Sequence, residues 1–97
     1  MDVGLDTAAT LVAACRRTVD AAAARLARDC AKGGRIDVEL LDREQVLAYD
    51  VASIAGQVTA AEEMLGYGER GELERLLTVA FAGMVAADLA GRVAGRE

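Results

Sequence analysis

A long apolar run near the C-terminal end constrains this chain more than any other feature. Residues 76–91 read LLTVAFAGMVAADLAG, and Asp88 is the single charge in the run. Drawn as a helix, the run is apolar almost all the way round, and such a helix is either buried from several sides or crosses a membrane. Two further helices in a chain of 97 residues can hardly cover it completely. The run therefore predicts a surface that a partner covers.

The net charge, the length of the apolar run and the N-terminal sequence limit the location and the partners that we expect for this chain. The apolar run is shorter than the ~20 residues that span a bilayer, and it carries Asp88 near its end, so we do not expect a membrane protein. The formal net charge of −5 argues against nucleic acid and against anionic membrane surfaces as partners. The N-terminus carries Asp2 and Asp6 and lacks a basic segment before an apolar run, so no signal peptide is expected. We expect a cytoplasmic protein.

Composition and periodicity predict an all-α fold. The chain holds no Pro, and only Gly interrupts its strong helix formers. We expect a single domain over residues 1–97, with Gly33-Gly34 ending the first helix and residues 35–41 forming a loop or helical turn without a strand partner. The expected helices span residues 6–32, 42–66 and 72–94. Short connectors predict an up-down-up antiparallel three-helix bundle, which would complete a larger bundle by oligomerisation.

The second expected helix has the clearest periodicity. Asp42 is expected to cap it, and Gln45 three residues later completes a capping-box pattern. Apolar residues then recur at steps of four and three, which is typical of a core seam. The seam consists of Leu47, Val51, Ile54, Val58, Ala61 and Leu65.

Small residues away from that seam favour close approach of a second backbone. Gly inside a helix costs about 1 kcal/mol relative to Ala, and a close helix contact offsets this cost. A tolerated surface Gly remains the alternative at Gly56. The candidate interface residues are Tyr49, Ala52, Gly56 and Ala60 on the second helix and Gly83, Ala87 and Gly91 on the third. The third helix also has an apolar stripe of Leu73, Leu77, Ala80, Met84 and Ala87, which Leu76, Phe81, Val85 and Leu89 widen.

The sequence predicts no catalytic residue and no metal site. The chain has no His, and Cys15 and Cys30 lie about 22 Å apart along one helix, so we expect two buried thiols without a disulfide. Asp50 and Asp88 border the apolar seams, where a carboxylate is costly unless it is paired. We expect a structural ion pair or a position at the end of the bundle. The candidate partners are Arg16, Arg17, Arg43 and Arg92, of which Arg92 lies one turn after Asp88. A catalytic carboxylate is the alternative.

A family resemblance covers roughly half of the chain, from about Asp42 to Val93. The matching pieces are Glu44-Gln45, VASIA at 51–55, AAEEML at 60–65 and AFAGMVAA at 80–87. In these pieces the hairpin resembles the paired long helices of acyl-CoA dehydrogenase-like flavoproteins. The resemblance implies a helical bundle that builds dimers and tetramers and flanks a flavin site. Glu44 stands where that family commonly has His, so the resemblance extends to architecture and assembly and assigns no catalytic or cofactor-binding residue.

Three functions remain open at this point. The leading expectation is a non-catalytic helical assembly or interaction domain without a cofactor, whose partner is a second copy or a larger protein subunit. The enzyme alternative is a segment of an FAD-dependent acyl-CoA dehydrogenase-like enzyme whose active site is completed elsewhere. The third is a regulatory helical bundle that binds a small ligand in an apolar pocket.

Overall fold

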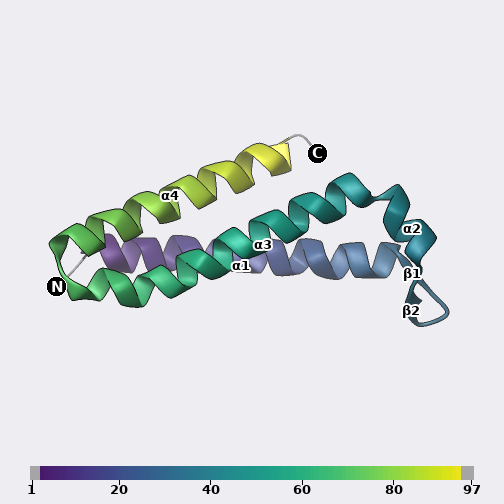
Figure 1. Ribbon diagram of the computed structural model, residues 1–97, viewed down its shortest axis with the longest axis horizontal. Helices are drawn as coiled ribbons and strands as arrows, with labels where there is room; N and C mark the ends of the chain where they lie inside the picture. Colours follow the sequence, from purple (N-terminus) through teal and green to yellow (C-terminus); the bar gives the residue numbers. More distant parts are fainter. Residues whose placement is uncertain (1–2, 95–97) are drawn as a thin grey trace.

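The computed structural model describes residues 3–94, and it is almost entirely helical (Figure 1). Its elements are α1 (Val3–Asp29), β1 (Ala31–Lys32), β2 (Arg35–Ile36), α2 (Val38–Arg43), α3 (Gln45–Tyr67), the 3-10 turn η1 (Gly68–Arg70) and α4 (Glu72–Ala94). The two strands hold two residues each, so the prediction of an all-α fold is confirmed.

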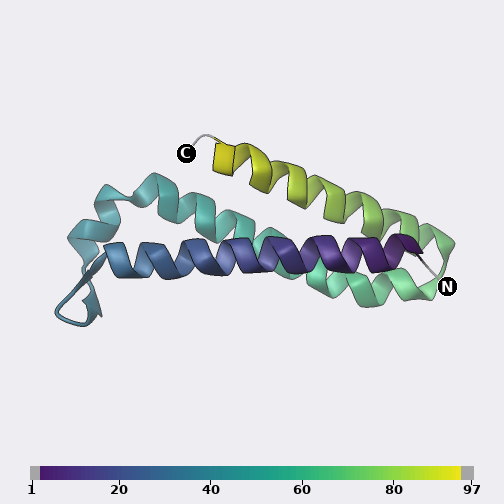
Figure 2. The same ribbon diagram turned by 180° about the vertical axis from the view of Figure 1, so that it is seen from behind.

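The three long helices lie side by side along the long axis of the molecule. α1 and α4 run in the same direction, and α3, which lies between them in the sequence, runs in the opposite direction (Figures 1 and 2). The 3-10 turn η1 connects α3 to α4. Both views show α1 and α3 continuing past the end of α4 toward the β-hairpin. The molecule measures 50 × 25 × 15 Å, and its radius of gyration of 15.7 Å exceeds the roughly 12.5 Å of a compact domain of this length. It is a narrow rod.

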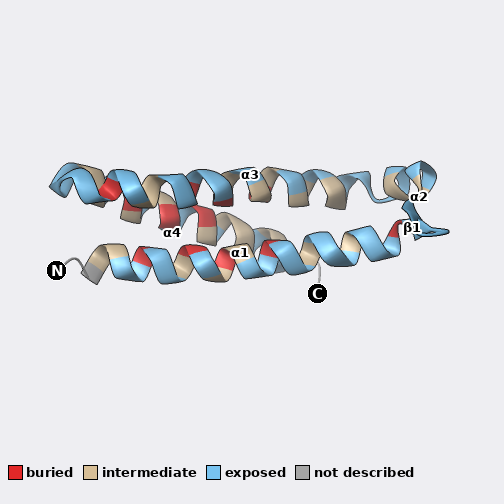
Figure 3. Ribbon diagram, turned by 90° about the horizontal axis from the view of Figure 1, so that it is seen from below, coloured by how far each residue is buried: buried red, intermediate tan, exposed pale blue. Residues whose placement is uncertain are grey.

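The core is a thin column on the line where α1, α3 and α4 meet. Its largest fully buried aliphatic side chains are Ile54, Val58 and Val85. Figure 3 shows buried positions on the inward side of each long helix and exposed positions over most of the outside. The buried apolar cluster consists of Ala8, Val12, Cys15, Val19, Ile54, Val58, Ala61, Ala82 and Val85. The predicted seam of the second helix is thus confirmed at its centre, whereas Leu47, Val51 and Leu65 toward its ends are only half-buried.

The connection after α1 differs from the prediction. α1 ends at Asp29 rather than at Lys32, and Ala31 and Lys32 pair with Ile36 and Arg35 in an antiparallel hairpin. Gly33 and Gly34, with φ of 62° and 79°, are the two central residues of its turn. Two consecutive left-handed residues give the turn geometry that suits a two-residue hairpin, and Gly adopts it without strain. The expectation that residues 35–41 lack a strand partner was wrong, because residues assigned to the first helix provide one.

The predicted cap at Asp42 was also wrong. Asp37, five residues earlier, caps a short helix that begins at Val38, and its Oδ1 accepts a hydrogen bond from the Leu40 N–H at 3.1 Å. Asp42 lies inside that helix, α2, and α3 begins at Gln45 after a break at Glu44 without a side-chain cap. Both aspartates are good N-caps, and the sequence pattern favoured the later one only because Gln45 follows it at the capping-box spacing.

The buried side of α4 consists of Thr78, Ala82 and Val85, with Phe81 and Leu89 packed beside them. The stripe that begins at Leu73 and Leu77 faces outward instead. Periodicity could not distinguish the two sides, because the helix is apolar around most of its circumference.

The turn from α3 into α4 depends on a close approach at Gly68. This residue is buried, and a Cβ built on it would lie 2.7 Å from Leu5 Cδ2 and 2.8 Å from Thr78 Oγ1. Thr78 cannot easily move away, because its hydroxyl lies 2.8 Å from the carbonyl oxygen of Glu74 and 3.0 Å from that of Met64. Gly68 therefore lets the start of α1 pack against the α3–α4 turn.

We predict that Gly68→Ala lowers the free energy of unfolding by about 1–3 kcal/mol, the usual cost of forcing an extra carbon into a packed site. Gly66→Ala is the matched control, since a Cβ at that position meets nothing within 4 Å. Urea denaturation followed by circular dichroism measures both changes. Equal effects of the two substitutions would show that the packing around Gly68 is looser than described.

Candidate functional site: the outer face of α4 and the ion pairs beside it

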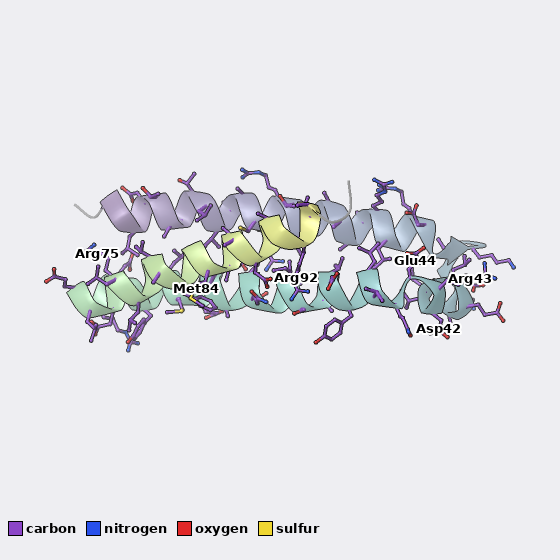
Figure 4. The ribbon with its side chains drawn as sticks, turned by 90° about the horizontal axis from the view of Figure 1, so that it is seen from above. Asp42, Arg43, Glu44, Arg75, Met84 and Arg92 are labelled. Carbon is purple, nitrogen blue, oxygen red and sulfur yellow. The ribbon has the colours of Figure 1, made fainter. Side chains whose placement is uncertain are left out.

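The side of α4 opposite its buried residues forms a continuous uncharged surface, which we call the outer face. At 3.6 residues per turn its members lie on the helix side away from Ala82 and Val85. All of them are exposed: Leu73, Leu76, Leu77, Ala80, Gly83, Met84, Ala87, Ala90 and Gly91. Figure 4 looks onto this face, with α4 lying in front of α1 and α3 and Met84 in view on it.

The large side chains of the outer face have little cover within the chain. Leu73 is 65% exposed, Met84 is 68% exposed, and Leu76 and Leu77 are each about half exposed. By length and composition α4 is apolar enough to cross a membrane, and 17% of its most apolar window is buried. Monomers rarely leave a large contiguous apolar surface in water, so the outer face is the candidate contact surface of this chain.

The candidate residues of the second helix occupy a separate exposed surface. Tyr49, Ala52, Gly56 and Ala60 are all exposed on α3, on the side away from its core seam. A Cβ built on Gly56, Gly83 or Gly91 meets nothing within 4 Å. These three glycines therefore lower helix stability without being needed for packing among the described residues. The structure thus places all seven candidate interface residues on exposed surfaces.

The three candidate buried charges meet in one cluster between α3 and α4. Arg92 Nη1 lies 2.6 Å from Asp50 Oδ1, and Arg92 Nε lies 3.2 Å from Asp88 Oδ1. The Gln57 amide donates to the other oxygen of Asp88 at 2.9 Å. Arg92 appears in Figure 4 between the two helices. The cluster is only partly buried, and it fixes the pairing of the C-terminal half of α4 with α3.

The hydrogen bonds of the cluster favour its charged forms. The Gln57 amide and then the Arg92 guanidinium hold the pKa of Asp88 below its ordinary value. Asp88, acting first through its hydrogen bond, raises the pKa of Arg92. A general acid or base that works near neutral pH needs a pKa shifted toward neutrality, which is the opposite direction for both groups. The arrangement is therefore that of a structural ion pair.

A second polar link joins α1 to α3, and sequence reasoning missed it. Arg16 approaches Glu62 with two nitrogens, at 3.0 and 2.8 Å, and also donates to the hydroxyl of Thr59 at 2.9 Å. The hydrogen bond and charge of Arg16 lower the pKa of Glu62, and Glu62 in turn raises the pKa of Arg16. Arg16 lies off the apolar stripe of α1, where a long charged side chain is commonly solvated. Its partner lies 46 residues away, so no local pattern identifies the pair.

The interior offers little room for a ligand. A cavity of about 70 Å³ lies beside the ion-pair cluster, where Val19, Leu47, Ile54 and Leu89 line it. Small-molecule sites usually measure about 300–1,000 Å³. Three more open surface depressions measure about 540, 430 and 300 Å³, and the last lies between α1 and α4, where Leu11, Ala86 and Val93 are among its lining residues. Among residues 3–94, no group of three His, Cys, Asp or Glu side chains is placed to hold a metal ion.

Both cysteines are free and buried. Burial raises the pKa of each thiol, and the nearby carboxylates of Glu44, Asp29 and Asp37 add to this effect at Cys30. A raised pKa lowers the thiolate fraction at neutral pH, so neither position is suited to nucleophilic chemistry.

Comparison with known proteins identifies no relative: the chain matches no protein-family model, no curated protein and no solved structure at a significant level.

We predict that the ion pair makes stability depend on pH. The lowered pKa of Asp88 contributes stability above the carboxyl's unfolded value of about 4, and this contribution is lost as the pH falls through the folded value. Asp88→Asn should therefore cost no more than about 1 kcal/mol at neutral pH, because the carboxylate is 40% exposed. The difference from the unchanged chain should shrink below about pH 4.

Thermal melts from neutral to acidic pH measure that difference. Asp29→Asn is the control, because its exposed carboxylate makes only a 3.8 Å contact with Arg25. A destabilisation by Asp88→Asn that stays constant across the whole pH range would contradict the assignment of this carboxylate to the ion pair.

Proposed function

We propose that this chain is a non-catalytic helical assembly domain, and that the outer face of α4 is its contact surface. In the assembled form, α1, α3 and α4 act as an up-down-up three-helix bundle that completes a larger bundle. A second copy of the chain, or a larger protein subunit, supplies the other part. The observation that carries the proposal is the uncharged outer face, with Leu73, Leu76, Leu77 and Met84 left in water.

The total surface of the chain supports the same conclusion. The chain has 6419 Å² of accessible surface, whereas a monomer of 10.1 kDa is expected to have about 5,300 Å². The excess of about 1,100 Å² is comparable to the roughly 800 Å² that each partner buries in a standard interface. A rod with this much surface gains from association, because apolar area removed from water stabilises the complex.

A membrane is a less suitable environment for α4 than a protein partner. Asp88 and Arg92 would have to enter the bilayer together with Asp50 of α3, and ionisable groups inside a membrane are costly. Short ion pairs tie α4 to α3 and α1 to α3, so α4 would also have to separate from a packed core. The apolar outer face by itself is compatible with a membrane or with a protein partner, whereas the ion pairs between the helices favour a protein partner.

The resemblance to acyl-CoA dehydrogenase-like flavoproteins supports assembly as the role of this hairpin, because that family uses the corresponding helices to build dimers and tetramers. It also motivates the enzyme alternative, in which the chain is one part of an FAD-dependent enzyme. Gln45 is the exposed first residue of α3, so this position is open to solvent within the single chain. A shift of the FAD absorbance spectrum on mixing with the purified chain would favour that alternative.

We predict that the purified chain has a native mass of about twice 10.1 kDa and that Met84→Glu weakens association about tenfold or more. A carboxylate in the centre of the outer face would lose its water on assembly. Because Met84 is 68% exposed, the substitution should leave the helix content of the monomer unchanged. Sedimentation equilibrium measures the mass, and circular dichroism measures the helix content.

Val38→Glu is the matched control, since Val38 is 70% exposed at the start of α2, far from the outer face. It should leave the native mass unchanged. A monomer at high micromolar concentration, with no copurifying subunit and no binding of a hydrophobic dye, would overturn the proposed function. Flotation of the chain with lipid vesicles would overturn it in favour of a membrane role.

A further inference from the structure

We propose that the partner of the outer face is a second copy of the same chain, and that the two α4 helices pack antiparallel with Leu73 and Leu77 of each opposite Gly91 and Ala87 of the other. This inference rests on the proposed assembly function and adds to it the identity of the partner and the register of the contact.

The spacing on the outer face is that of a coiled-coil seam. Leu73, Leu77, Ala80, Met84, Ala87 and Gly91 follow one another at steps of four and three residues. A strict alternation of three and four places side chains on one line of an under-wound helix and suits packing against another long helix. The seam runs for about 27 Å along α4, and all of its members are exposed. It is therefore a second packing surface, independent of the core side at Ala82 and Val85.

The sizes of the side chains select an antiparallel partner. When two copies of the seam meet head to tail, Leu73 lies level with Gly91, Leu77 with Ala87, and Ala80 with Met84. Every level then pairs one large residue with one small residue, and twofold symmetry repeats the same three pairs in the other half. The interhelix distance can stay constant along the contact, because the sum of the facing volumes changes little.

A parallel pair lacks this match. It would place Leu73 on Leu73 and Leu77 on Leu77 at one end, and Ala87 on Ala87 and Gly91 on Gly91 at the other. The two helices would be forced apart at their first turns and would leave a gap at their last turns. Both overpacking and voids are destabilising. The seam therefore fits itself in one orientation only.

The residues beside the seam fit the same arrangement. On one flank, Leu76 comes level with Ala90, and Gly83 meets Gly83 of the other copy next to the twofold axis. The helix dipoles favour this orientation too, because antiparallel packing opposes the two dipoles whereas parallel packing aligns them.

The face is suited to a second copy despite the net charge of −5, because none of its nine residues is charged. Repulsion between two acidic chains then acts only at a distance, where salt screens it. The total accessible surface of the chain exceeds that of a typical monomer of its mass by about 1,100 Å², which is more than the roughly 800 Å² that one chain buries in a dimer of standard size.

Thiol crosslinking of single-cysteine additions tests the orientation directly. Leu77→Cys and Ala87→Cys are prepared separately, treated with a short thiol-to-thiol crosslinker alone and as an equal mixture, and analysed by peptide mass spectrometry. The proposal predicts a 77–87 crosslink in the mixture at a yield at least about tenfold above the self-crosslink of either variant, because proximity raises the effective concentration. The native Cys15 and Cys30 are buried, and peptide identification separates them from the added thiols.

Gly83→Cys gives a second measurement if Leu77→Cys folds poorly. Gly83 is exposed and lies beside the predicted twofold axis, so this variant should crosslink to itself. Self-crosslinking of Leu77→Cys without a 77–87 product would overturn the antiparallel register while leaving the assembly function intact. A dimeric mass with no crosslink at residues 77, 83 or 87 would place the interface elsewhere, and it would overturn both this inference and the assignment of the outer face as the contact surface, while leaving assembly itself as a role of the chain. A monomeric mass would overturn this inference, and a monomer with no copurifying subunit and no binding of a hydrophobic dye would overturn the assembly function as well.

Discussion

The width of the core is the physical constraint on which the rest of the structure depends. The largest side chains that are fully buried among residues 3–94 include Ile54, Val58 and Val85, and most of their neighbours in the core are Ala, Val or Cys. A column built from such side chains covers only one side of each helix, because burial follows the contact area that a side chain can reach. The long helices therefore form a rod, and α4, which is apolar on nearly every side, keeps one apolar side in water.

Two polar links hold the helices in register around this thin core. Arg16 connects α1 to α3 through Glu62, and Arg92 connects α4 to α3 through Asp50. Ion pairs that are this exposed contribute little to stability, so their main effect is on specificity. A narrow core of small aliphatic side chains tolerates sliding of one helix past another, whereas a guanidinium that must meet its carboxylate does not. The same links fix the outer face of α4 pointing away from α1 and α3, where a partner can reach it.

Sequence reasoning predicted the long helices and the centre of the core correctly. It failed where the position or orientation of an element depended on contacts between residues far apart in the sequence. The seam around Ile54 was predictable because only one side of that helix is strongly apolar. The inward side of α4 was not, since Leu73 and Val85 lie on opposite sides of a helix that is apolar around most of its circumference. The pair of Asp88 and Arg92 was predictable, because the two residues lie one helical turn apart. The contacts of Asp50 and Gln57 with this pair were not, because they come from another helix and depend on the tertiary fold. The hairpin at Gly33-Gly34 was missed because the same two glycines are also a common helix ending.

The oxidation rates of two methionines test most directly whether the outer face of α4 is covered in solution. Met84 lies in the middle of that face and is 68% exposed within one chain, whereas Met64 on α3 is half-buried in the same chain. Hydroxyl-radical footprinting at rising protein concentration, read by peptide mass spectrometry, compares the two side chains in one experiment. Assembly through α4 predicts that Met84 becomes the slower of the two as the concentration rises, reversing their order of exposure within the single chain. Faster oxidation of Met84 than of Met64 at every concentration would contradict it.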